Sequence, residues 1–338
     1  MDYLWKVGRY VKSANALEQT STQKRKKRSG SSIRDDIELT LLAVPTTVWY
    51  LIFCYLPMFG LVLAFKDYRI VDATKGFIYN LIQSEWTLTG NFEFFLKSSQ
   101  FGIVLRNTLL YNIVFIVLNI VIPVSLAILI NQLYSKRKSK TYQTMMFMPH
   151  FMSWVVVSYF VFAFLSYDKG LLNSVLEAFG KDPINWYTEA KYWPFILVFM
   201  QIWKTVGYNM VVYLASISGI DTSLYEAGAL DGASKFQQAI HITLPALKPV
   251  IIMMFILSVG RIFSTDFGLF YQIPRGVTNS LYEATMTFDV YIYNMLLTPN
   301  VPIGRTAAAG FFQSVIGCIT ILVANAIVRK VDRQSAII

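Results

Sequence analysis

Six long apolar segments constrain the fold of this 338-residue chain more than any other feature. Each is long enough to cross a bilayer, since about 20 helical residues span its hydrocarbon core. The segments cover approximately residues 39–65, 107–131, 143–166, 192–216, 246–269 and 306–328. They are continuously apolar and do not alternate in polarity, which argues against transmembrane strands. The sequence therefore predicts an all-α integral membrane protein with six transmembrane helices.

The composition supports a membrane protein. Hydrophobic residues make up 55% of the chain and charged residues only 15%, and the mean hydropathy is +0.47, outside the soluble globular range. The two cysteines, Cys54 and Cys318, both lie in apolar runs. We interpret them as apolar packing residues, which argues against a disulfide framework or a zinc site. Residues 1–36 lack a continuous apolar stretch, so no signal peptide is expected.

Lysine and arginine positions orient the chain. If both termini are cytoplasmic, 18 of these residues lie in cytoplasmic segments and 10 in external ones. The excess is concentrated next to the spans, at residues 24–28 and 136–140. This is the bias of cytoplasmic loops toward positive charge. We therefore predict cytoplasmic termini and a cytoplasmic loop at 217–248, and we attribute the net charge of +10 to orientation and not to a nucleic-acid partner.

Two domains are expected: a basic cytoplasmic tail at residues 1–36 and a six-span domain at residues 37–338. Apolar residues from Tyr3 to Leu17 recur at helical spacing. One interpretation is an amphipathic helix on the inner leaflet, where Lys24 to Arg28 would add attraction to anionic lipid. The alternative is a disordered, solvated tail joined through the flexible residues 29–32.

A polar loop at 217–248 breaks the apolar pattern. Its most distinctive part, residues 226–249, reads EAGALDGASKFQQAIHITLPALKP. A Glu-Ala-small triplet is followed at fixed spacings by a glycine and by Ile-x-Leu-Pro. The seven specified positions are Glu226, Ala227, Gly228, Gly232, Ile242, Leu244 and Pro245. An ordinary interhelical loop is the alternative interpretation, but it leaves the fixed spacing of seven positions unexplained.

The loop is expected to contain two short helices. The first would cover 224–230, with N-cap candidates at 221–223 and Glu226 in the first turn, where the helix dipole favours an acid. Gly232 can adopt a positive φ and turn the chain. The second helix would cover 234–240, and the fifth span would begin after it. We expect Phe236, Ala239 and Ile240 to anchor the second helix to the membrane domain, and Pro245 and Pro249 to pre-set φ in the first turn of the span.

This loop resembles the cytoplasmic coupling loop of permease subunits in binding-protein-dependent ABC importers. Four other segments resemble the maltose-type carbohydrate branch and, within it, the polysaccharide or oligosaccharide permeases. They are AFKDY at 64–68, MPHFMSWVVV at 148–157, DFGLFYQIP at 266–274 and GFFQSVIG at 310–317. The resemblance covers residues 39–335. Gly228 departs from the family pattern, which more often has alanine there, although the position remains small.

The resemblance implies a type I ABC importer permease fold in a prokaryotic plasma membrane. It implies a second homologous permease subunit, giving a heterodimer, two ABC ATPase subunits, and an extracellular or periplasmic solute-binding protein that delivers a carbohydrate. ATP and Mg²⁺ would bind the ATPase partners, so this chain is expected to bind no cofactor or metal and not to be an enzyme. The residues assigned to ATPase coupling are Glu226, Ala227, Gly228, Asp231, Gly232, Ala233 and Pro245.

Polar residues within spans four and five are candidates for the solute pathway, because they are costly in a membrane and often functional. Gln201, Lys204 and Tyr208 are spaced to share one helix face, and Ser258 and Arg261 to share another. The candidate set is Gln201, Trp203, Lys204, Tyr208, Ser258, Arg261 and Asp266. If the cations face the pathway, an acidic or uronate-containing sugar is favoured. The alternative is an internal ion pair of Lys204 or Arg261 with Asp266.

Aromatic residues also mark the external segments. Five of them lie in the first external loop: Phe77, Tyr79, Trp86, Phe92 and Phe94. They predict either a contact with the binding protein or an aromatic belt at the membrane surface.

Other functions find less support in the sequence. An intramembrane enzyme would need a catalytic motif, yet the only histidines are His150 and His241, neither in HExxH, and no P-loop pattern is present. A secondary carrier has no use for an ATPase-docking loop, and inverted repeats are not evident. A purely structural or receptor role, and an ABC permease for a non-sugar polar solute, remain alternatives.

Overall fold

The computed structural model describes residues 30–331, with side chains from residue 37 to residue 330. The amphipathic stretch from Tyr3 to Leu17 and the basic run at 24–28 therefore lie outside the described residues. The chain divides into two compact units, Met1–Gly60 and Leu61–Ile338, which are described separately.

A long helical run forms the first predicted span. It consists of α2 (Gly30–Tyr50), the π-helical turn η1 (Leu51–Tyr55) and the 3-10 segment η2 (Leu56–Phe65), which crosses into the second unit. The stretch Ile37–Phe65 is long and apolar enough to cross a membrane. Pro57 lies two residues after the end of the π-helical turn. Because its ring crowds the carbonyl four residues earlier and it has no N–H to donate, the preceding turn is widened.

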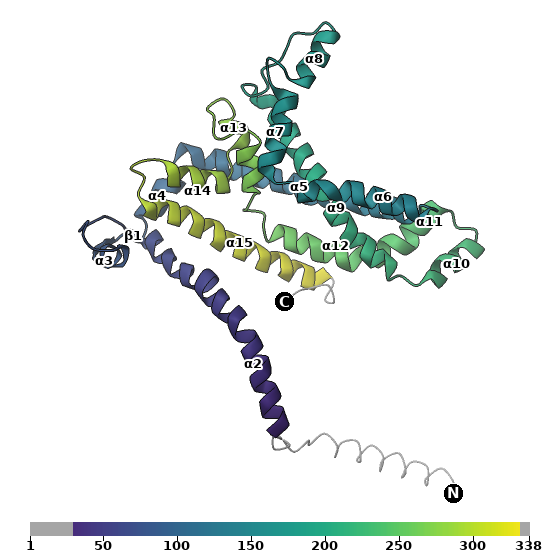
Figure 1. The fold of residues 1–338 in the computed structure, drawn as a ribbon, viewed down its shortest axis with the longest axis horizontal. Coiled ribbons are helices and arrows are strands. Elements are labelled where there is room, and N and C mark those ends of the chain that lie inside the picture. The colour runs from purple at the N-terminus through teal and green to yellow at the C-terminus, as the bar shows by residue number, and fades with distance from the viewer. Residues whose placement is uncertain (1–29, 332–338) are drawn as a thin grey trace. The chain divides into compact units, whose positions relative to one another are not determined.

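Four further helical runs in the second unit are long and apolar enough to span a membrane. They are α5 (Ser99–Asn131), α9 (Trp193–Ser218), the run Lys235–Val259 ending in α12 (Leu244–Val259), and α15 (Ile303–Val331). Figure 1 shows these helices lying beside one another. Between α5, α9 and α12 the packing is apolar, with Ala127, Met210 and Leu247 fully buried in one cluster. The predicted all-helical membrane architecture is confirmed.

The third predicted span is broken. The helix α6 (Lys136–Phe147) continues as a 3-10 turn, η3 (Met148–Phe151), and α7 (Trp154–Leu165) leaves it at 99°. Pro149 lies in the 3-10 turn, Met152 is extended (φ −76°, ψ 135°), and the hydroxyl of Ser153 accepts a hydrogen bond from the Val156 N–H to begin a new helix. The predicted span at 143–166 is therefore a bent pair of helices and not one continuous helix, because the Pro149 turn and the Ser153 cap end one helix and start another.

The fifth span begins and ends earlier than expected. The short helix α11 (Lys235–Gln238) runs through a π-helical turn, η5 (Ala239–Thr243), directly into α12. Pro245 lies in the first turn of α12, as predicted, whereas Pro249 lies inside it; α12 continues the run from α11 without a break. The wide turn places the amide of Leu244 on the carbonyl of Ala239, which accommodates the missing N–H of Pro245.

An irregular segment from Gly260 to Thr287 follows α12. It contains a π-helical turn, η6 (Gly268–Gln272), and a short helix, α13 (Tyr282–Thr285). Polar side chains of α5 bind its backbone: Asn107 donates to the carbonyls of Glu283 and Met286 at 2.8 and 3.0 Å, and Tyr111 donates to Ala284 at 2.7 Å. Backbone that is not helical must find such partners in a membrane protein, since lipid offers none.

Smaller elements complete the second unit. These are α3 (Phe77–Gln83), α4 (Gly90–Leu96), α8 (Leu171–Ala178), η4 (Ala190–Tyr192) and α14 (Phe288–Leu297). Two strands of two residues each, β1 (Lys66–Asp67) and β2 (Glu85–Trp86), pair antiparallel on either side of α3, a departure from an all-helical chain. Phe95, Phe288 and Phe312 pack ring against ring where α4, α14 and α15 meet.

Candidate coupling loop and solute pathway

The first helix of the loop is capped by Asp221. Helix α10 (Thr222–Leu230) begins after this residue, whose carboxylate accepts a 2.9 Å hydrogen bond from the Ser223 N–H. That backbone bond holds the pKa of the Asp221 carboxyl below its usual value. The cap is therefore ionised at neutral pH and complements the positive end of the helix dipole.

Gly232 ends α10 in a left-handed turn. Its φ is +78°, the Ala233 N–H donates to the Gly228 carbonyl at 2.8 Å, and the Gly232 N–H donates to the Ala229 carbonyl at 3.1 Å. This pair of bonds is the Schellman motif, in which a glycine at the turning position avoids the penalty of a side chain. The structure thus explains why a glycine stands four residues after the Glu-Ala-small triplet.

The second half of the loop folds back onto α10. Ser234 and Gln237 form a reciprocal capping box at the start of α11. The hydroxyls of Tyr225 and Thr243 lie 2.9 Å apart, and the buried amide of Gln238 donates to the Ala233 carbonyl at 3.3 Å. These bonds make the loop a braced helical hairpin.

Gly228 faces the interior of this hairpin. A Cβ built on it would lie 3.3 Å from Ile242 Cδ1 and 3.9 Å from Ala233 Cβ. The small residue therefore lets α10 lie close to η5 within the same chain. The small residue at position 228 is therefore needed for packing within the hairpin. From the sequence alone, this role could not be told apart from close approach by a partner protein.

Most of the predicted coupling residues are accessible. Glu226, Ala227, Asp231, Gly232 and Pro245 are exposed, whereas Gly228 and Ala233 are half-buried. Two large apolar side chains are exposed beside them, Leu230 at 89% and Phe236 at 73%. Phe236 and Ile240 therefore do not anchor the second helix to the membrane domain, as the sequence had suggested. Ala239, the third residue of that prediction, is buried.

The break between α6 and α7 is held by Lys204 of α9. Its ammonium donates to the carbonyls of His150 and Met152 at 2.9 and 2.6 Å. Carbonyls at a helix end have no partner within the helix, and a cation there also complements the negative end of its dipole. Lys204 thus stabilises the interruption.

Trp154 lies between Lys204 and Asp266. The Lys204 ammonium is 5.2 Å from the centre of the indole ring, and the indole N–H donates to Asp266 Oδ2 at 2.7 Å. The other oxygen of Asp266 accepts from the Gly268 N–H at 2.9 Å. Among the described side chains, neither Lys204 nor Arg261 forms the direct ion pair with Asp266 that was the alternative prediction, because Trp154 and the Gly268 backbone hold that carboxylate.

Tyr208 belongs to an aromatic stack at the same break. Its ring lies parallel to His150, with centroids 4.6 Å apart, and Phe147 stacks farther out at 6.3 Å. Tyr208 is 47% exposed. Close approach of α6 and α9 makes the stack possible, since a Cβ on Gly207 would lie 2.0 Å from the Met146 carbonyl oxygen.

The remaining pathway candidates differ in their surroundings. Gln201 has a buried side-chain oxygen without a hydrogen-bond partner in the described part of the chain. The Ser258 hydroxyl donates to the Met254 carbonyl of its own helix at 2.7 Å. Arg261 is exposed and lies beyond the end of α12. The prediction that it shares a helical face with Ser258 is therefore wrong.

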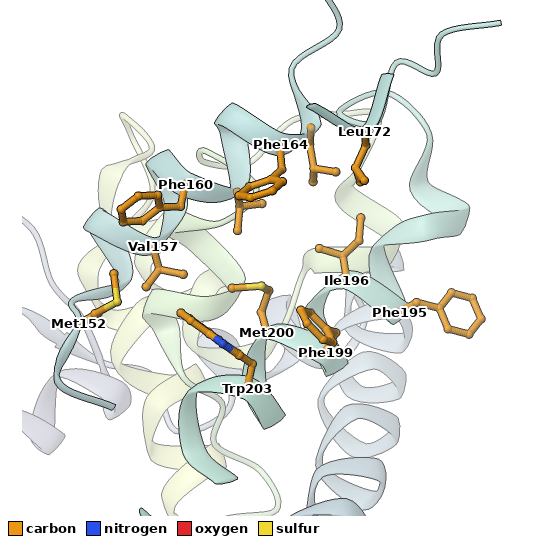
Figure 2. A pocket seen from close by; sticks show the side chains of 12 residues that line it. Met152, Val157, Phe160, Phe164, Leu172, Phe195, Ile196, Phe199, Met200 and Trp203 are labelled. Atoms are coloured by element: carbon orange, nitrogen blue, oxygen red, sulfur yellow. The ribbon is translucent and has the colours of Figure 1, made fainter. Parts of the chain in front are cut away.

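Trp203 lines a pocket that the sequence did not predict. The pocket lies between α7 and the first half of α9, has a volume of about 750 Å³ and is lined by apolar side chains. Figure 2 shows Phe160 and Phe164 on one side of it and Met200 and Trp203 on the other. The sequence contains one indication of this pocket: phenylalanines four residues apart, at 160 and 164 and at 195 and 199, share a helix face in each case. Such a lining suits hydrocarbon and offers few groups for sugar hydroxyls.

Comparison with known proteins identifies the class of this chain. Residues 136–333 match the family described as the binding-protein-dependent transport system inner membrane component. Protein LplB of Bacillus subtilis is 33% identical over 90% of this chain and 92% of its own length. The polygalacturonan/rhamnogalacturonan transport system permease protein YteP of the same organism is 31% identical over 88% and 89%.

A solved structure agrees with these relatives. The chain superposes with a TM-score of 0.77 on a chain of the bacterial alginate ABC transporter in complex with an alginate pentasaccharide-bound periplasmic protein. The two chains are 32% identical, and the similarity covers 90% of this chain and 98% of the other. The protein belongs to the inner-membrane components of binding-protein-dependent transport systems and is a multi-pass permease subunit of a bacterial ABC importer for oligo- or polysaccharides, whose ATPase is a separate subunit.

Proposed function

We propose that this permease passes an acidic oligosaccharide through a pathway centred on the break between α6 and α7, and that the hairpin at 217–248 receives the movement of the ATPase. The observation that carries the pathway proposal is the adjacency of Lys204 and the Tyr208–His150 stack at that break.

The stack is suited to a sugar. Pyranose rings have apolar faces that lie against aromatic rings and hydroxyls that need hydrogen-bond partners. Tyr208 offers a half-exposed ring and a hydroxyl, and Phe151, which packs against Phe147 of the same stack, is 74% exposed.

The charge at the break favours an acidic sugar. Lys204 uses two of its three ammonium hydrogens on carbonyls, and no carboxylate of the described chain lies within ion-pair distance of it. A carboxylate on the solute would complement this charge. Two of the similar proteins are named for uronate-containing polymers, polygalacturonan and alginate.

The partners follow from the hairpin and the family. We propose a heterodimer with a second homologous permease, two ATPase subunits beneath it, and a solute-binding protein on the other side. The exposed side chains of Glu226, Leu230 and Phe236 form a polar and apolar surface that an ATPase groove could hold. Because a ligand shifts an equilibrium only by binding two states differently, this surface must contact the ATPase differently before and after ATP binds.

Transport assays test the proposal. The complete importer, reconstituted in liposomes with its binding protein, is supplied with ATP and with labelled galacturonate or alginate oligosaccharides or neutral glucose oligomers. We expect uptake of the acidic oligomers, near-complete loss in Tyr208→Ala, and retention in Tyr208→Phe. Lys204→Arg should keep uptake, whereas Lys204→Gln should lose it for acidic oligomers. Uptake of neutral oligomers alone by the unaltered protein would overturn the acidic assignment, and full uptake by Tyr208→Ala would overturn the pathway.

A further inference from the structure

Helix α3, in the loop after the first span, has its polarity reversed. Its polar residue Asn80 is only 3% exposed, and Ser84 at its C-terminal end is buried too. The amide of Asn80 donates to the carbonyls of Asp72 and Lys75, and its oxygen accepts from the Asp72 N–H. Ile78 and Ile82, one turn apart, are 70% and 67% exposed. A short helix surrounded by water would have the opposite arrangement.

The exposed isoleucines belong to a larger apolar patch. Its members are Ile70, Val71, Phe77, Ile78, Ile82, Trp86 and Leu88, each at least half exposed. No other described part of the chain covers them. Seven such side chains within one short segment outside the spans mark a contact surface.

Lys66 ties this patch to the end of the first span. Lys66 is the residue directly after that span, and its buried ammonium donates to the carbonyls of Leu81, Ile82 and Ser84 at 2.8, 2.9 and 3.1 Å. The ammonium also lies 4.8 Å from the centre of the Trp86 ring. Since a helix of seven residues is about 10 Å long, all of α3 stays within roughly that distance of the point where the chain leaves the membrane.

Aromatic and basic side chains border the patch. Lys75 lies 4.0 Å from the centre of the Tyr79 ring, and the guanidinium of Arg69 is exposed while it pairs with Asp67 at 2.6 Å. Tryptophan and tyrosine concentrate at the level of lipid headgroups, and flanking cations reach headgroup phosphates.

We infer that α3 and Trp86 form an anchor that lies in the lipid headgroup region at the outer end of the first span. The apolar face of Ile78, Ile82 and Trp86 enters the boundary of the acyl chains, while Asn80 and Ser84 satisfy the backbone of the loop from behind. This places the reversed helix in the one environment near the span that solvates an apolar face.

Site-directed fluorescence tests the anchor in the complete importer. With Cys54 and Cys318 replaced by alanine, single cysteines at Ile78 or Ile82 are labelled with an environment-sensitive dye in lipid nanodiscs. Glu85→Cys is the matched control, because it precedes Trp86 in the strand and points to the opposite side. Uptake by each labelled complex confirms that it is folded.

We expect blue-shifted emission at positions 78 and 82, quenching by lipids spin-labelled near the headgroup, and little quenching by iodide, with the reverse at position 85. Equal iodide quenching at all three positions would overturn the inference. Protection from both quenchers that persists in detergent would also overturn it, because the patch would then be covered by a protein, either the second permease or the binding protein.

Discussion

The indole N–H of Trp154 donates a 2.7 Å hydrogen bond to the carboxylate of Asp266, joining the first residue of α7 to the segment that follows α12. Gly268 lies directly beneath the indole, where a Cβ would approach Trp154 Cδ1 to 2.1 Å. This side-chain pair therefore helps to link the two broken regions of the chain, one within the third span and one after the fifth.

Loss of this bond is expected to weaken the link. Trp154→Phe keeps an aromatic ring but removes the donor to Asp266 Oδ2, and we expect it to destabilise the complex by about 1 kcal/mol, the usual net value of one hydrogen bond. Thermal unfolding of the purified importer measures this. Asp266→Asn and the double variant complete a cycle, in which additive effects would show that the two residues are not coupled.

Gly207 sets the distance between α6 and α9. Gly207→Ala would place a methyl group against the Met146 carbonyl, so the helices must separate. We expect about 1–3 kcal/mol of destabilisation and loss of uptake, since the Tyr208–His150 stack would open. Gly310→Ala is the control, because a Cβ there meets nothing within 4 Å. Normal uptake and stability in Gly207→Ala would show that the two helices need not lie in contact.

The hairpin should discriminate between its two glycines. The methyl group of Gly228→Ala is tight only against the flexible end of Ile242, and the variant gains helix propensity of about 1 kcal/mol, so uptake should be kept. Gly232→Ala must adopt φ +78°, at a cost of about 1–2 kcal/mol, and should loosen the turn. ATP-driven uptake in proteoliposomes compares the two variants. Equal uptake by the two variants would contradict a requirement for positive φ at Gly232.

The exposed apolar side chains of the hairpin should bind the ATPase without supporting the fold. Leu230→Ser and Phe236→Ser remove apolar surface that the chain itself does not bury, so stability should stay within about 0.5 kcal/mol. Co-purification of the ATPase should fall sharply. Thr222→Ala, exposed on the same helix as Leu230, provides the comparison. Undiminished ATPase binding in both serine variants would remove these side chains from the interface.

Much of this architecture can be predicted from the sequence. Bilayer thickness demands long apolar helices, so their number and approximate position follow from composition along the sequence. The turn at Gly232 was also predictable, because a positive φ has few other solutions. The ends of the spans were harder to predict. Pro149 and Ser153 were visible as helix-ending and helix-starting residues, but their position inside an apolar run concealed the 99° break.

Tertiary structure alone decided which polar groups meet. Lys204 and Asp266 were both candidates for a direct pair, yet Trp154 lies between them and the carbonyls of His150 and Met152 take the ammonium. The reversed polarity of α3 could not be predicted from the sequence either. Lys66 and Asn80 bind backbone carbonyls of residues 15 and 8 positions away, and only the folded loop brings these groups together. Apolar length is a local property that a sequence displays directly, whereas hydrogen-bond partners depend on where separate segments come together in space.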